Sequence, residues 1–236
     1  MNIATERLRI DTRPRQREIV LTFIRHSAVF LNMRLRPKKY ILLSGLVAAV
    51  LIPLTGIGAP AKPKVLTAKA AMVIDADKGT ILFKRNPYVR LPAASTVKVL
   101  TALMAVKQLD GAATVTISKR AAGISPSKVY LSENKQYKVN DLLSCLLICS
   151  ANDAGVALAE AMAPSECRFS LQMNAYAKAL GAKNSLFLNA TGLPEGKQQQ
   201  YSTVYDLCLF MKKSLRYPLL VKIMETKRMT IAGSDG

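Results

Sequence analysis

Hydrophobic residues recur along this chain with two different periods, which predict strands in some segments and helices in others. Two short apolar runs, 71–75 and 80–83, flank a turn that contains Asp and Gly, so we expect them to form a β-hairpin. Apolar residues recur at helical spacing over 99–109 and stop at Asp110-Gly111, which predicts a helix that ends there. A strand-like run at 114–117 follows, and then a loop rich in Ser, Pro and Gly.

Apolar segments in the second half of the chain predict four further helices. Asn140 is predicted to be the N-cap of the first of them and Ser202 that of the last. A final strand-like run begins at Arg228. A hairpin, then helices, then a strand indicate an α+β fold, in which a helical cluster packs on an antiparallel sheet. The predicted helices span 141–149, 154–162, 169–180 and 203–215.

Charge divides the chain into segments of different character. There are 34 Lys and Arg against 15 Asp and Glu, a formal net charge of +19. A basic stretch at 34–39 precedes an uncharged, mostly apolar run that ends in Ala59-Pro60-Ala61. This order is typical of a secretory signal peptide, which we predict over 34–61. An uncleaved membrane anchor is the alternative, and Pro53 with the glycines after it favours cleavage by interrupting the apolar run.

These boundaries predict three parts: a basic N-terminal extension at 1–33, the signal peptide at 34–61 and one globular domain at 62–236. Met33 stands just before the basic stretch, so we state the hypothesis that translation begins there and that residues 1–32 of the extension are not translated. The mass of the expressed protein tests this hypothesis. The mature domain is expected to be exported, to the periplasm or the outer face of the cytoplasmic membrane.

Composition excludes several chemistries from the globular domain. The single histidine is His26, so a Ser-His-Asp triad and an HExxH zinc site are both excluded. No cysteine spacing indicates a metal site, so we expect no metal. Lysines are scattered rather than clustered with aromatic residues, which argues against nucleic acid as a partner, whereas a basic exported surface can contact an anionic membrane surface.

The cysteines are interpreted as mostly buried small apolar residues. Export permits disulfides, so one bridge among them stays open. The four are Cys145, Cys149, Cys167 and Cys208.

The segment Pro92-Ala-Ala-Ser95-Thr-Val-Lys98 carries the first candidate chemistry. Ser95 stands at the start of a predicted helix, and Lys98, three residues later, shares its face. A partly desolvated lysine is neutral for a fraction of the time and can take the serine proton as general base. The helix N-terminus adds a backbone N–H where an oxyanion would form. The alternative is a helix-capping serine beside a solvated lysine.

A second motif, Ser150-Ala151-Asn152, lies 55 residues after Ser95 and follows an apolar segment. By itself it is typical of a capped break between two helices. Ser-x-x-Lys followed by Ser-x-Asn, however, is the order found in penicillin-binding proteins and class A β-lactamases. The two motifs together therefore favour a serine acyl-transfer site.

The chain resembles the low-molecular-mass penicillin-binding proteins, and more narrowly the serine-type D-alanyl-D-alanine carboxypeptidases of peptidase family S11. The resemblance covers 68–236 and rests on the runs that begin at Ala71, Arg90, Leu146 and Tyr201. It implies a DD-peptidase/β-lactamase-like fold. The family removes the terminal D-alanine from peptidoglycan stem pentapeptides, is acylated by β-lactams and needs no cofactor. The roles that the resemblance implies are nucleophile for Ser95, proton acceptor for Lys98, proton relay for Ser150 and substrate-binding amide for Asn152.

The chain departs from the family pattern at two places. Thr191-Gly192-Leu193 stands where the family often has His-Gly-Leu, so a loop contact near the site is expected to differ. The family's Lys-Thr-Gly motif is expected roughly a hundred residues after Ser150, and the sequence ends at Gly236. We therefore expect a C-terminally truncated domain in which the last strands, and with them a second oxyanion donor, are missing.

Two other functions remain open at this point. A β-lactamase of this layout needs a loop carboxylate about 35 residues after the second motif. The segment around Leu186 offers none, and Glu166 and Glu195 lie too early and too late. An inactive or wall-binding homologue is the other alternative, which the missing third motif favours and the intact first two motifs oppose.

Overall fold

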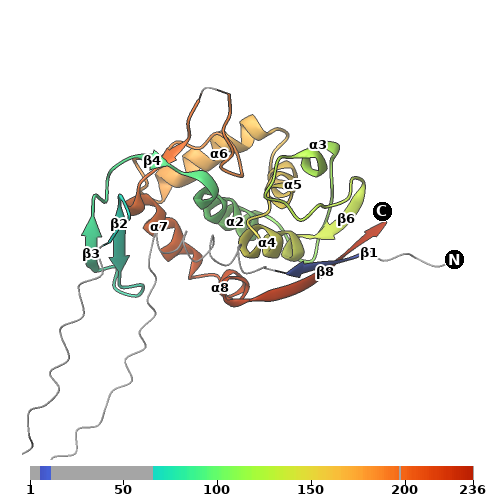
Figure 1. Cartoon of the computed structure of the whole chain (residues 1–236), viewed down its shortest axis with the longest axis horizontal. Coiled ribbons are helices and arrows are strands. Elements are labelled where there is room, and N and C mark those ends of the chain that lie inside the picture. Colours follow the sequence, from blue (N-terminus) through green and yellow to red (C-terminus); the bar gives the residue numbers. More distant parts are fainter. Residues whose placement is uncertain (1–5, 12–65, 197, 236) are drawn as a thin grey trace, which may run out of the picture.

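The computed structural model describes residues 6–11, 66–196 and 198–235, and in these parts helices occupy the middle with β-structure on either side (Figure 1). In chain order the elements are β1 (Glu6–Asp11), β2 (Ala71–Ile74), β3 (Ile81–Arg85), β4 (Leu91–Pro92), the 3₁₀ turn η1 (Ala94–Thr96), α2 (Val97–Gln108), β5 (Thr114–Thr116), α3 (Lys119–Gly123), β6 (Lys135–Lys138), α4 (Val139–Ile148), α5 (Asn152–Met162), α6 (Glu166–Ala179), β7 (Tyr201–Ser202), α7 (Val204–Ser214), α8 (Pro218–Glu225) and β8 (Arg228–Asp235).

Helices α2, α4 and α5 form the centre of the fold. Their apolar residues, among them Leu103, Leu143 and Leu158, are completely buried in one hydrophobic core. Helices α6 and α7 close this core with Phe169 and Phe210. Burying one such side chain contributes about 1.5–3 kcal/mol, so the helical cluster accounts for most of the apolar stabilisation.

The strands fall into three antiparallel sheets. The largest has the order β1-β8-β6-β5 and packs on α4 and α5. The β2–β3 hairpin lies at the opposite side of the helical cluster, against α7 (Figure 1). The third sheet is the short pairing of β4 with β7, in which Leu91 faces Ser202 and Pro92 faces Tyr201. This pairing matters for the site because β4 leads directly into the turn of Ser95.

Most of the elements predicted from the sequence are confirmed. The hairpin, the helix after Pro92, the strand at 114–116, the four later helices and the final strand are all present. Gly181, with a φ of +89°, follows the end of α6 as predicted, because glycine adopts this left-handed conformation without steric cost. A helical cluster packed on an antiparallel sheet, the predicted α+β class, is the observed architecture.

Both predicted N-caps are wrong. Helix α4 begins before Asn140, because backbone carbonyls already accept its first N–H groups: Val139 N donates to Ala113 O at 2.9 Å and Asn140 N to Gly111 O at 3.1 Å. Helix α7 is capped by Thr203 rather than Ser202, and the Thr203 side chain accepts a hydrogen bond from Asp206 N at 3.1 Å. Contacts with distant backbone decide the start of α4. At α7, Ser202 pairs with Leu91 in strand β7, so the helix begins one residue later with Thr203 as its cap.

Several elements were not predicted, among them strand β6 and the helices α3 and α8. Strand β6 has the sequence Lys-Gln-Tyr-Lys, with Tyr137 as its one buried apolar residue, so alternation is too weak to reveal it. Pairing with both β5 and β8 makes it a strand. Helix α3 spans only five residues in a segment expected to be a loop, and α8 spans eight. Short elements of this kind depend on packing more than on local pattern.

The predicted signal peptide at 34–61 lies outside the described residues, as does most of the N-terminal extension. Within the ranges that the structure covers, no helix is long and apolar enough to cross a bilayer.

The cysteines are all free thiols: Cys145 and Cys208 are buried, and Cys149 is half-buried. For Cys167 the predicted burial is wrong, because it lies on the exposed side of α6.

Strand β3 exposes all five of its residues, including Ile81, Leu82 and Phe83, which are 42%, 65% and 47% exposed. In the described part of the chain it pairs only with β2. Exposed apolar edge strands pair with other chains. We therefore expect Leu82→Lys to lower self-association of the purified chain, measured by sedimentation as a function of concentration. Leu171→Lys, on the exposed face of helix α6, is the matched control, and an equal effect of both changes contradicts strand-edge pairing.

Candidate active site

Ser95 lies in the 3₁₀ turn η1, immediately before helix α2. Its neighbour Ala94 has a φ of +44°, in the left-handed region that non-glycine residues rarely adopt. Such strain persists only where the surrounding structure enforces it, and it often marks functional sites. The Ser95 side chain is half-buried. The turn places it at the N-terminal end of α2, where backbone N–H groups lack partners within the helix.

Lys98 lies one turn further along and faces Ser95. It is only 3% exposed, and its Nζ donates a hydrogen bond to Ser95 Oγ at 3.1 Å. Burial lowers the pKa of Lys98 from 10.5 to about 8, and the negative charge of Asp153 partly opposes this by raising it. A measurable fraction of Lys98 is therefore neutral near pH 7, and the neutral amine can accept the serine proton.

Ser150 and Asn152 lie at the junction between α4 and α5. Ser150 has a φ of +55°, and the hydrogen bond from Ala151 N to Cys145 O at 3.2 Å closes the end of α4 around it. Asn152 opens α5 and is only 2% exposed. The predicted break between two apolar helices is thus confirmed, and its serine is held in a sterically costly conformation.

Asn152 is already engaged with the loop after α3. Its Nδ2 donates to Ser125 O at 2.8 Å, and its backbone N–H donates to Ser127 O at 2.7 Å. The side-chain oxygen and the second N–H of Nδ2 are therefore the groups of Asn152 left for a substrate. Its assignment as a substrate-binding amide stays a prediction.

The structure brings Ser95 and Lys98 into contact but does not join Ser150 to them. Among the described residues, no hydrogen bond links the Ser150 side chain to Ser95 or to Lys98. The role of Ser150 as a proton relay therefore also stays a prediction.

Asp153 is a site residue that the sequence reasoning missed. It is completely buried, and its Oδ2 accepts hydrogen bonds from Val129 N at 3.1 Å and Leu131 N at 3.0 Å. It therefore ties the 129–131 loop to α5, and its charge also acts on Lys98. The sequence signal was an acidic residue directly after Ser-Ala-Asn, inside an otherwise apolar helix.

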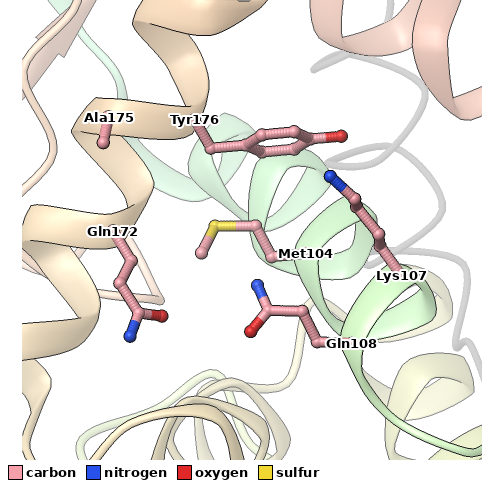
Figure 2. A pocket seen from close by; sticks show the side chains of 6 residues that line it. All are labelled: Met104, Lys107, Gln108, Gln172, Ala175 and Tyr176. Carbon is pink, nitrogen blue, oxygen red and sulfur yellow. The ribbon is translucent and has the colours of Figure 1, made fainter.

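A hollow of about 420 Å³ between α2 and α6 is separate from this site. Figure 2 shows it at the far end of α2, beside Met104 and Gln108. A 12-residue helix rises about 18 Å, so the length of α2 separates the hollow from Ser95. Its remaining lining residues are Lys107, Gln172, Ala175 and Tyr176, with Lys107 Nζ 5.0 Å from the Tyr176 ring centroid.

Across the described ranges, no group of three His, Cys, Asp or Glu side chains could hold a metal ion.

The helical cluster on an antiparallel sheet, with a serine at a helix start and a buried lysine one turn on, defines the class of the DD-peptidase fold. The chain belongs to peptidase family S11, D-alanyl-D-alanine carboxypeptidase, whose model matches residues 58–234.

Individual relatives agree with this assignment. D-alanyl-D-alanine carboxypeptidase DacF of Bacillus subtilis is 37% identical over 164 residues, which are 67% of this chain and 42% of that protein. The crystal structure of DacD from Francisella tularensis matches with a TM-score of 0.64 and 31% identity, over 74% of this chain and 43% of that one. Penicillin binding protein 5 from Haemophilus influenzae matches with a TM-score of 0.62 and 33% identity, over 70% and 50%. The chain thus spans about half the length of the curated relatives it matches.

Proposed function

We propose that this chain carries the acylation site of a serine-type D-Ala-D-Ala carboxypeptidase. The observation that carries the proposal is the 3.1 Å contact between Lys98 Nζ and Ser95 Oγ, with the lysine buried. Membership of the S11 family supports the same substrate class, the D-Ala-D-Ala end of peptidoglycan stem peptides.

The proposed reaction is acyl transfer in two steps. Neutral Lys98 takes the hydroxyl proton of Ser95 while Ser95 Oγ attacks the carbonyl carbon of the penultimate D-alanine. The backbone N–H at the start of α2 donates to the developing oxyanion. The peptide C–N bond then breaks, and the leaving D-alanine nitrogen receives a proton, which Ser150 would relay. Water hydrolyses the ester and restores the Ser95 hydroxyl.

The structure offers no support for a β-lactamase. Of the two glutamates considered above for this role, Glu166 forms an ion pair with Arg120 on α3. Glu195 accepts a hydrogen bond from Asn189 Nδ2 at 3.0 Å. Both carboxylates are held by neighbouring side chains and are therefore poor candidates for activating a deacylating water.

The proposed partners follow from this chemistry. They are peptidoglycan stem peptides as substrate and β-lactams as acylating inhibitors. We also propose an exported protein, in the periplasm or at the outer face of the cytoplasmic membrane, on the strength of the predicted signal at 34–61. A basic mature surface would favour contact with anionic membrane lipids, and nucleic acid is not proposed as a partner.

A fluorescent penicillin tests the site directly. We expect the wild-type chain to be labelled covalently at Ser95 and Ser95→Ala to lose all labelling, because the nucleophilic oxygen is gone. Ser165→Ala is the matched control: Ser165 caps α6, its side chain accepts from Arg168 N at 3.2 Å, and it lies outside the site. Labelling is measured by gel fluorescence and located by mass spectrometry.

Each other outcome favours a different function. An unlabelled wild-type chain contradicts the proposal and favours the inactive or wall-binding homologue. Fast release of the label as hydrolysed drug favours a β-lactamase. Release of D-alanine from a stem pentapeptide, followed over time, separates carboxypeptidase turnover from acylation alone.

A further inference from the structure

Residues in 187–196 and 198–202 contact the chain on both sides of Ser95. Before the serine, Ala93 N donates to Gln200 O at 3.3 Å, next to the pairing of β4 with β7. After it, Thr101 Oγ1 on α2 donates to Ala190 O at 2.8 Å. The turn that carries the nucleophile is therefore held between two contacts with one distant segment.

Gly192 makes the closest approach to this turn. Its φ is +85°, and a Cβ added there would lie 1.9 Å from Ala94 O and 2.3 Å from Ala94 C. Both of those atoms are backbone, so they cannot move aside as the end of a flexible side chain could. Ala94 directly precedes Ser95 and is itself in the left-handed region. The loop at Gly192 therefore packs against the peptide that sets the orientation of Ser95.

The Asn189 side chain folds this loop onto itself. Asn189 is 3% exposed, and its Oδ1 accepts from Gly192 N at 2.8 Å, Gln200 Nε2 at 3.0 Å, and Thr191 N and Oγ1, both at 3.2 Å. Its Nδ2 donates to Leu193 O at 2.9 Å and to Glu195 Oε2 at 3.0 Å. One buried amide thus uses both its donor and its acceptor capacity to shape the segment that carries Gly192.

We propose that Asn189 is a positioning residue for acylation: it holds Gly192 against Ala94 and thereby keeps Ser95 Oγ in hydrogen-bond reach of Lys98 Nζ. The inference rests on the proposed function, because such positioning has a chemical consequence only if Ser95 is acylated. A displacement of about 1 Å in such a pair can lower the rate about 10²-fold.

Two variants disturb the contact between Gly192 and Ala94 from the side of the loop, and a third serves as control. Asn189→Ala removes the side chain whose hydrogen bonds fold the loop. Gly192→Ala forces the loop backbone away from Ala94, because the added Cβ would overlap with Ala94 O and C. The matched control is Asn174→Ala: Asn174 Nδ2 donates to Phe187 O at 2.7 Å and its Oδ1 accepts from Phe187 N at 2.9 Å, but it does not contact the Ser95 turn. All three should lower the melting temperature. Only the first two should slow penicillin labelling of Ser95, by about 10²-fold.

The pH dependence of labelling separates positioning from general destabilisation. In Asn189→Ala, a loosened turn admits water to Lys98, so the labelling midpoint should move upward from about 8, whereas Asn174→Ala should keep the wild-type midpoint. The charged group that acts on Lys98 from α5, Asp153, is unchanged in both variants. If Asn189→Ala does not fold, Thr191→Val replaces it. This change removes the hydroxyl that donates to Asn189 Oδ1 at 3.2 Å and accepts from Leu193 N at 3.3 Å. Because one or two hydrogen bonds of the loop are then lost rather than all of them, about tenfold slowing is expected.

Failure of the inference and failure of the proposed function give different results. Equal labelling rates and midpoints in wild type, Asn189→Ala and Gly192→Ala overturn the positioning role while the function stands. If wild type is not labelled, the function fails, and a ¹³C NMR titration of Lys98, assigned with Lys98→Met, decides the positioning role. An upward move of its pKa in Asn189→Ala supports that role, and an unchanged pKa overturns it.

Discussion

Lys98→Met is expected to abolish measurable penicillin labelling of Ser95 while making the fold more stable. General-base catalysis contributes about 10²–10⁴-fold, and methionine cannot accept the serine proton. The stability gain arises because burial lowers the pKa of Lys98 from 10.5 to about 8. At pH 7 this pKa difference corresponds to a loss of about 3 kcal/mol in the free energy of unfolding. Methionine is uncharged and of similar length, so Lys98→Met should avoid part of this loss.

The lowered pKa of Lys98 also determines how the stability of the folded chain changes with pH. The unfolded chain holds the Lys98 proton more tightly than the folded chain does, so wild-type stability rises with pH between about 8 and 10.5. The advantage of Lys98→Met should therefore be largest below pH 8 and vanish above 10.5. Denaturant melts at several pH values measure it. Lys107→Met, at an exposed position of the same helix, is the control and should lose no labelling. Retained labelling in Lys98→Met would falsify its role as base.

Asp153→Ala is expected to cause the largest loss of stability among these changes. The buried carboxylate accepts from the backbone N–H groups of Val129 and Leu131. Leaving a buried donor without a partner costs about 1–3 kcal/mol, so the free energy of unfolding should fall by about 2–6 kcal/mol. Denaturant unfolding followed by circular dichroism measures the change.

Asp153→Asn separates the charge of this residue from its hydrogen bonds. The amide keeps an acceptor oxygen, so its stability loss should be smaller than that of alanine. Because the charge of Asp153 raises the pKa of Lys98, its removal should lower that pKa below about 8. Wild-type labelling should rise with pH through about 8, and the midpoint for Asp153→Asn should lie lower. A midpoint that stays in place, or moves upward, contradicts electrostatic coupling between the two residues.

The predictions that succeeded concern local patterns. The hairpin around Asp77, the apolar periodicity of α2 and the break at Ser150 each depend on residues within one or two turns of chain. The pair Ser95 and Lys98 is local too, since residues three apart on a helix share a face. The predicted cap of α4 failed because distant backbone decides that end: Gly111 and Ala113 receive the first N–H groups of α4. The predicted cap of α7 was wrong by one residue, because Ser202 pairs with Leu91 in a strand and Thr203 caps the helix.

The longer helices, the hairpin and the adjacent serine and lysine follow from local pattern, because hydrophobic period and helical spacing act over a few residues. How that serine and lysine can react depends on contacts between segments that are distant in the sequence. The pKa of Lys98 depends on its burial within the folded helical cluster and on the charge of Asp153, 55 residues away. The orientation of Ser95 depends on a loop about a hundred residues later in the sequence, where Gly192 packs against Ala94. Desolvation and close packing between distant segments exist only after the chain has folded.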